Sequence, residues 1–144
     1  MKRSSARKVF FDSDVIIAGT FSKTGASHIV LQLAEIGIVH GHISDQVVEE
    51  CTRNIRKQLP AALPLFQSIL DASFLTVVIP ADEYLMRARD QADDKDVPIL
   101  AAALQAQADV LVTFNTKDYF PHESPPTILT PRDVLKTIGK GRYP

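Results

Sequence analysis

The stretch Lys8-Val9-Phe10-Phe11-Asp12-Ser13-Asp14 decides the fold of this chain, because a strongly apolar run ends abruptly at two acids. Such a run is typical of a buried strand, and the acids that follow it would lie at its carboxyl end. An acid directly after three large apolar residues is uncommon unless it has a partner. We therefore take Asp12 as the first candidate site residue and place it at the edge of a sheet.

Strands and helices alternate along the rest of the chain. Apolar runs predict further strands over residues 38–43, 74–79, 110–113 and 127–129. Apolar spacing and capping residues predict helices over residues 27–36, 45–57, 60–70, 82–92, 97–104 and 130–138. This order predicts a three-layer α/β/α fold with a central parallel sheet of four to five strands. We expect one domain over residues 1–144, in which residues 1–7 form a flexible basic N-terminus.

Size and composition are those of one ordinary globular domain. Of the 144 residues, 45% are hydrophobic and 23% are charged, which excludes a disordered chain and allows one buried core. The single cysteine, Cys51, excludes an internal disulfide and fits a reducing compartment. Acids interrupt the N-terminal apolar run, and no other run is long enough to cross a membrane. We therefore expect a cytoplasmic protein with no signal peptide and no membrane partner.

The net charge of −1 lacks the basic excess of many nucleic-acid-binding proteins, but the charges are unevenly placed. Basic residues gather in residues 1–8 and 132–142, whereas residues 82–96 hold six acids against three bases. An acidic centre between basic segments would suit a metal site that also holds a phosphate backbone. Solvated faces and a frayed terminus would explain the basic segments equally well.

Further acidic and amide side chains fall where the same sheet edge would gather them. In an open parallel sheet, ligands collect outside the carboxyl ends of the strands, near the point where the strand order reverses. Four separate segments supply candidates: Asp12 and Asp14, Glu49 and Glu50, Asp93, Asp94 and Asp96, and Asn115 and Asp118. Converging carboxylates repel one another unless they meet a cation, and Mg²⁺ or Mn²⁺ prefers such oxygen ligands. The sequence therefore predicts a divalent-metal site.

Some of these residues also have structural explanations. Asp96 is well placed to cap the helix that follows it, and Asp14 could orient Asp12 or bind backbone in the turn. Glu49 and Glu50 flank the apolar stripe of their helix on opposite sides, so periodicity does not choose between them. His40 and His42 share a face of the second strand, and we interpret that pair as structural.

Taken together, these segments resemble the PIN-domain nucleases, particularly the bacterial PIN-type toxins of toxin–antitoxin pairs. The matching stretches lie in order over residues 11–16, 44–50, 93–104 and 108–120. The resemblance implies that the first three acids of the site are Asp12, Glu50 and Asp96. Two departures concern Asp14, where such proteins commonly have Asn, and Asn115, where they commonly have Asp. A subgroup carries Asn followed three residues later by Asp, as here, so Asp118 would supply the missing charge.

The resemblance implies a metal-dependent endoribonuclease that uses Mg²⁺ or Mn²⁺ to activate water and steady the scissile phosphate. The residues it implies as catalytic are Asp12, Glu50, Asp96, Asn115 and Asp118, and all of these except Asn115 would bind the metal. The residues expected to support the ligands are Ser13, Asp14, Asp93 and Thr113. Lys95 and Lys117 are the basic residues expected to contact RNA. The resemblance further implies a small antitoxin partner and a homodimer.

Two alternatives belong to other functional classes. Asp12-Ser13-Asp14-Val15 after an apolar strand is also similar to the first motif of haloacid-dehalogenase-like phosphatases, in which the first Asp is a nucleophile. That family needs a later strand ending in paired acids, whereas no apolar strand immediately precedes the acids of residues 93–96. A PIN-like module that binds RNA or protein without catalysis is the other alternative, and Asn115 favours it slightly.

Overall fold

The computed structural model describes residues 6–139, apart from the side chains at positions 75 and 76. Residues 1–5 of the expected basic N-terminus lie outside the described residues, and Arg7 already begins the first strand. The strands are β1 (Arg7–Phe11), β2 (Val39–Ser44), β3 (Phe74–Val78), β4 (Val110–Val112) and β5 (Thr127–Leu129). The α-helices are α1 (Ser13–Phe21), α2 (Ala26–Glu35), α3 (Asp45–Gln58), α4 (Leu63–Ser73), α5 (Asp82–Ala88), α6 (Val97–Gln105) and α7 (Pro131–Gly139). Three short 3₁₀ helices are η1 (Pro60–Ala62), η2 (Asp94–Asp96) and η3 (Thr116–Asp118).

The five strands form one parallel sheet in the order β3-β2-β1-β4-β5. The chain builds the sheet outward from β1 to β3 and then returns to place β4 on the free side of β1. The strand order therefore reverses between β1 and β4, and their carboxyl ends open a crevice there. A backbone hydrogen bond from Asp12 N to Val112 O, 3.0 Å long, closes the top of this strand pair.

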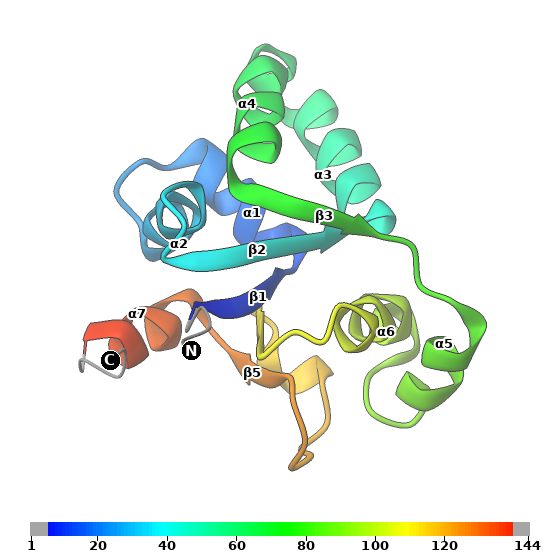
Figure 1. The fold of residues 1–144 in the computed structure, drawn as a ribbon. Coiled ribbons are helices and arrows are strands. Elements are labelled where there is room, and N and C mark those ends of the chain that lie inside the picture. The colour runs from blue at the N-terminus through cyan, green and yellow to red at the C-terminus, as the bar shows by residue number, and fades with distance from the viewer. Residues whose placement is uncertain (1–5, 140–144) are drawn as a thin grey trace.

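Helices cover both faces of the sheet, as Figure 1 shows. Helices α5 and α6 pack together on one face, while α2 packs with α1, α4 and α7 on the other, and α3 joins that layer through α1. The predicted three-layer α/β/α architecture with a parallel sheet is thus confirmed. Among the described residues, no helix is both long and apolar enough to cross a membrane.

The core lies on both sides of β1 and β4, whose apolar residues are almost fully buried. Phe10, Phe11 and Leu111 have no exposed surface, and they separate the two helical layers. Residues 101–103 of α6 are three fully buried alanines, so this helix lies close against the sheet. That close packing sets the position of the acids that precede α6.

Most predicted elements are present, with differences at their ends and one omission. The sequence prediction did not include α1, because Val15 and Ile16 belong to a short run that is apolar on nearly every side and has no helical periodicity. The helix expected over residues 82–92 ends at Ala88, and the one expected over residues 60–70 starts as η1 and continues as α4. Gly37, at φ +83°, follows shortly after α2, in the left-handed conformation that glycine adopts readily at a helix end.

Candidate metal centre

The candidate site lies in the crevice at the reversal point of the sheet. Asp12 leaves β1 and caps α1, its Oδ1 accepting a hydrogen bond of 2.8 Å from the backbone N–H of Ser13. Its other oxygen, Oδ2, accepts hydrogen bonds from the hydroxyl groups of Thr113 at 3.0 Å and Tyr119 at 3.1 Å. Three donors from three segments therefore fix the Asp12 carboxylate in one orientation.

Asp12 is only 7% exposed, and this burial has an electrostatic cost. Burial, reinforced by the charge of Asp14, raises the pKa of Asp12 to about 6, although its three hydrogen bonds act in the opposite direction. No basic side chain is among the causes of this shift. A buried acid pair without a cationic partner is the electrostatic pattern of a site that receives one.

Asp14 ties the start of α1 to the loop that follows β4. Its Oδ2 accepts hydrogen bonds from the backbone N–H of Phe114 and from Asn115 Nδ2, each 3.1 Å long, with the Thr113 hydroxyl at 3.4 Å. Its Oδ1 is buried and has no partner among the described residues. Burial raises the pKa of Asp14, and the charge of Asp96 raises it further. We call Asp12 and Asp14 the inner pair.

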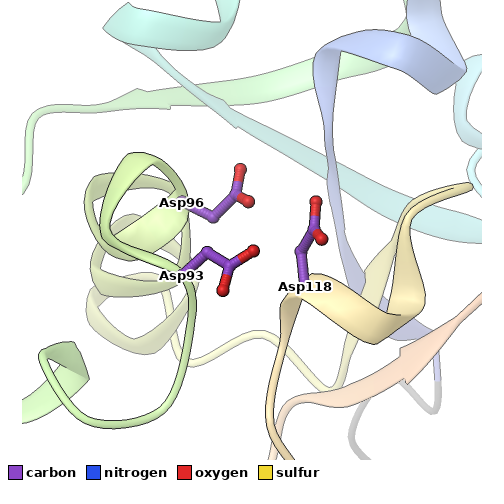
Figure 2. Close-up of side chains that lie close together, drawn as sticks. All are labelled: Asp93, Asp96 and Asp118. Atoms are coloured by element: carbon purple, nitrogen blue, oxygen red, sulfur yellow. The ribbon is translucent and has the colours of Figure 1, made fainter.

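A second acidic group, the outer cluster, consists of Asp93, Asp96 and Asp118. One carboxylate oxygen of each lies within 4.8 Å of the others, and Figure 2 shows the three side chains converging from the start of α6 and from η3. A backbone hydrogen bond of 2.9 Å from Asp93 N to Asp118 O joins the two segments. Because Asp96 raises the pKa of Asp14, the outer cluster and the inner pair share one electrostatic environment.

The expectation that the Asp96 side chain caps α6 is wrong. Asp96 occupies the N-cap position, but η2 continues directly into α6, and the side chain makes no capping hydrogen bond. Pro98 in the first turn has no N–H that would need a cap. The Asp96 carboxylate is thus free to lie close to those of Asp93 and Asp118 in the outer cluster.

Lys95 bridges the outer cluster. Its Nζ lies 2.7 Å from Asp96 Oδ2 and 2.8 Å from Asp118 Oδ2, while 68% of its side chain stays exposed. These contacts lower the pKa of Asp118 and raise that of Lys95. Lys95, which the sequence places at the phosphate, is thus engaged with two candidate ligands.

The structure distinguishes the two glutamates that helix periodicity leaves equivalent. The Glu50 side chain accepts hydrogen bonds from the Ser13 hydroxyl at 2.9 Å and from Gln46 Nε2 at 3.2 Å, and it is half-buried. Glu49 is exposed and has no such hydrogen bonds, although both glutamates line one depression with Asp45 and Arg53. Ser44 caps α3, its hydroxyl accepting from Val47 N at 3.2 Å, which fixes this arrangement.

The remaining predicted residues fall around the same crevice with different environments. Thr113 is fully buried between the inner pair and also accepts a hydrogen bond of 3.1 Å from the Asn115 backbone N–H. The Asn115 side-chain amide is directed to Asp14. Lys117 is exposed on η3, next to Asp118. His42 is buried in β2 with both ring nitrogens unpartnered among the described residues, and its pKa is lowered by burial.

Tyr119 is a site residue that the sequence prediction did not include. It is 4% exposed, and its hydroxyl contacts Asp12. Burial and the negative charges of the surrounding carboxylates raise the pKa of Tyr119, so its hydroxyl remains a neutral donor. Residue 119 lies within the matching stretch 108–120, but a single buried tyrosine has no spacing that distinguishes a core residue from a site residue.

The donor set fits a divalent cation. All the groups that converge are carboxylates, one buried Asp14 oxygen lacks a partner, and an ammonium group already bridges two of the acids. Hard cations such as Mg²⁺ and Mn²⁺ prefer oxygen donors, whereas a zinc site would use Cys and His. The buried Cys51 contributes no thiolate, because burial and the neighbouring acids raise its pKa.

Comparison with known proteins agrees with this fold. A VapBC2 structure from Rickettsia felis, bound to a DNA fragment from its promoter, has a similar fold with a TM-score of 0.60 at 19% identity; the match covers 85% of this chain and 96% of that one. The structure of PAE2754 from Pyrobaculum aerophilum has a TM-score of 0.58 at 16% identity, covering 94% of this chain and 92% of that one. No curated protein sequence gives a significant match.

A family model described as PIN domain matches residues 8–117, which is well over half of the chain. The match includes the first three acidic segments and Asn115 of the fourth, and it ends one residue before Asp118. The match runs from β1 into η3 and so includes the inner pair, Glu50, Asp93 and Asp96. It confirms the family resemblance seen in the sequence, and this family differs from the haloacid-dehalogenase alternative. The chain therefore belongs to the PIN-domain family of nucleases.

Proposed function

We propose that this protein is an endoribonuclease that hydrolyses RNA phosphodiester bonds with Mg²⁺ or Mn²⁺. One observation carries the proposal: the PIN fold brings the inner pair and the outer cluster together at the reversal point of the sheet, with the outer ligand atoms within 4.8 Å of one another. A divalent cation there would supply the positive charge that stabilises the anionic transition state of phosphodiester hydrolysis.

We assign the ligand role to Asp12, Glu50, Asp96 and Asp118, and we add Asp93 because its carboxylate lies in the outer cluster. Ser13 orients Glu50, and Thr113 and Tyr119 orient Asp12, through the hydrogen bonds described above. Asn115 holds Asp14, which supports Asp12 through the Thr113 hydroxyl that both carboxylates contact. Lys95 and Lys117 stand beside the acids and would contact the phosphate backbone.

We further propose that the protein is the toxin of a toxin–antitoxin pair, with a small antitoxin as partner, and that it forms a homodimer. The sequence resemblance to PIN-type toxins supports this, and a VapBC2 assembly of similar fold is known on promoter DNA. Growth of bacteria that express the wild type should stop, whereas expression of Asp96→Asn should not stop it. The same cells should recover when an open reading frame adjacent to the gene is co-expressed.

Cleavage of RNA tests the nuclease proposal directly. Purified protein should cut single-stranded RNA with Mg²⁺ or Mn²⁺, stop in chelator and resume when metal is restored. Asp96→Asn should lose at least a hundredfold in rate, as expected when a charge that positions the metal is removed. Glu83→Gln, an exposed acid on α5 away from the crevice, is the matched control and should keep full rate.

Three outcomes separate the alternatives. Cleavage at full rate in chelator would exclude the metal mechanism. Metal binding without cleavage of any RNA offered would favour the non-catalytic module. Cleavage that Asp96→Asn leaves unchanged would show that the activity comes from a contaminant or from another site.

A further inference from the structure

Two large aromatic side chains beside the acids are exposed. Phe114 follows β4 directly and is 49% exposed, and Phe120 follows η3 and is 40% exposed. Asp118 of the outer cluster lies between them in the chain, and the buried Tyr119 precedes Phe120. An exposed phenylalanine is unremarkable alone, but two on one loop that also carries a candidate ligand call for a physical reason.

The backbone of both phenylalanines is fixed. The N–H of Phe114 donates to Asp14 Oδ2 at 3.1 Å, and the N–H of Phe120 donates to Gln91 O at 2.8 Å. An isolated antiparallel bridge between Ala92 and Tyr119 holds the second segment further. Both rings are therefore exposed on an ordered segment, one before and one after Asp118 in the chain.

Phe120 forms part of a shallow depression next to the outer cluster. The depression has a volume of about 570 Å³, and its lining includes Arg89, Asp93, Lys95 and Phe120. It thus contains an aromatic face and two cationic side chains beside three acids, which are Asp90, Asp94 and Asp93 of the outer cluster. Arg89 is exposed and makes no ion pair among the described residues.

We propose that Phe120, with Phe114 on the other side of Asp118, is a stacking surface for unpaired bases that flank the scissile phosphate. Single-stranded nucleic acids bind where aromatic faces receive successive bases and basic side chains follow the backbone. Arg89 and Lys95 line the depression with Phe120, and Lys117 lies between the two phenylalanines in the chain. The bases of a duplex are stacked on each other, so the surface selects single-stranded over double-stranded RNA. This inference deepens the proposed function and rests on it.

The test separates the effect of the aromatic ring from the effect of side-chain size. Phe120→Leu keeps an apolar side chain but removes the aromatic face, and Phe120→Trp keeps the face. Phe21→Leu is a matched control because Phe21 is also 40% exposed and lies at the opposite end of α1 from Asp14. Affinity for a fluorescent twelve-nucleotide single-stranded RNA is measured by anisotropy in chelator, where no cleavage should occur, and kcat and KM are measured with Mn²⁺.

Phe120→Leu should weaken single-stranded RNA binding roughly five- to hundredfold, the range of one base–aromatic stack. The loss should appear mainly in KM, with Mn²⁺ affinity unchanged. Phe120→Trp should bind as the wild type does, Phe21→Leu should show no change, and binding of duplex RNA should be equally weak in all four proteins. Phe114→Leu should show its own loss, and it decides the question if Phe120→Leu does not fold.

The outcomes separate this inference from the nuclease proposal. If the wild type cuts RNA and both leucine variants bind and cut it normally, the stacking surface is excluded while the nuclease stands. If the wild type cuts no RNA but its RNA binding still depends on the two rings, the nuclease fails and the stacking surface stands. If Phe120→Leu leaves RNA binding intact but abolishes self-association or binding of an antitoxin, the rings form a protein interface and the inference is wrong.

Discussion

The Tyr119 hydroxyl donates a hydrogen bond of 3.1 Å to Asp12 Oδ2, joining the loop after β4 to the acid that ends β1. Both groups are nearly excluded from solvent, at 4% and 7% exposure. The bond lowers the pKa of Asp12 and so partly offsets the burial that raises it. Tyr119 therefore helps to keep the carboxylate ionised and oriented for a cation.

Tyr119→Phe should weaken Mn²⁺ binding, and more strongly at pH 6 than at pH 8. Loss of the donor raises the pKa of Asp12 above its present value of about 6, so a larger fraction of Asp12 is protonated at pH 6. The free energy of unfolding at pH 8 should fall by about 1.5–3 kcal/mol, the range for a hydrogen bond to a charged group. Calorimetric titration with Mn²⁺ and urea unfolding measure the two effects.

Tyr84→Phe is the matched control for this change. The Tyr84 ring lies on α5, where the Arg87 guanidinium carbon stands 5.1 Å from the ring centroid, and it takes no part in the crevice. It should leave Mn²⁺ affinity unchanged at both pH values. Equal losses in the two variants would indicate a general effect of removing a hydroxyl group and would refute the positioning role of Tyr119.

Asp12→Asn should stabilise the metal-free protein at neutral and alkaline pH while it abolishes metal binding. The folded-state pKa of Asp12, about 6, lies above its ordinary value of 3.8, so the folded state holds the proton more tightly. The free energy of unfolding therefore falls as the pH rises from about 4 to about 6, by up to roughly 3 kcal/mol from this group. The neutral amide avoids this loss.

Urea unfolding in chelator at pH 4 and pH 8 measures the difference between Asp12→Asn and the wild type. The variant should gain stability relative to the wild type at pH 8 and gain little at pH 4. A variant that is less stable at pH 8 would mean that the Asp12 carboxylate is not destabilised by its burial.

The fold could be predicted largely from the sequence because its strands are short, continuously apolar and separated by helical patterns. The expected position of Asp12 follows from a local rule, since it ends a strand whose register is fixed on both sides. Asp96 shows the limit of such rules: its cap position was correct, but the 3₁₀ turn before it leaves the carboxylate free. That outcome depends on how η2 packs, which apolar spacing does not encode.

Contacts between distant segments account for most of the remaining differences. Tyr119 and Asp12 are 107 positions apart, and Glu50 and Ser13 are 37 apart, so neither contact leaves a local pattern. Helix periodicity placed Glu49 and Glu50 at similar angles, and only the position of α1 against α3 separates them. Because α1 was itself absent from the prediction, this choice could not be made from spacing alone.

Glu50→Gln should reduce Mn²⁺-dependent cleavage at least tenfold, whereas Glu49→Gln should leave it within twofold of the wild type. Glu50 is half-buried and bonded to Ser13, while Glu49 is exposed. The amide keeps the size of the side chain but lacks the charge that orients or holds the metal. Such a loss commonly lowers metal affinity or activity ten- to a hundredfold. Single-turnover cleavage assays on the two folded variants measure the difference, and the reverse order would assign the ligand to Glu49.

Lys95→Met should tighten Mn²⁺ binding roughly two- to fivefold, the size expected for the loss of a competing exposed ion pair. Its ammonium group contacts Asp96 at 2.7 Å and Asp118 at 2.8 Å, so a cation that enters the outer cluster must displace it. The same variant should bind RNA less tightly, because it lacks the ammonium group that, in the metal-bound wild type, would be free to contact the phosphate backbone. Lys117→Met, which removes an exposed charge from η3 without an ion pair to the cluster, should weaken RNA binding and leave Mn²⁺ affinity unchanged. Weaker Mn²⁺ binding in Lys95→Met would show instead that Lys95 organises the acids for the metal.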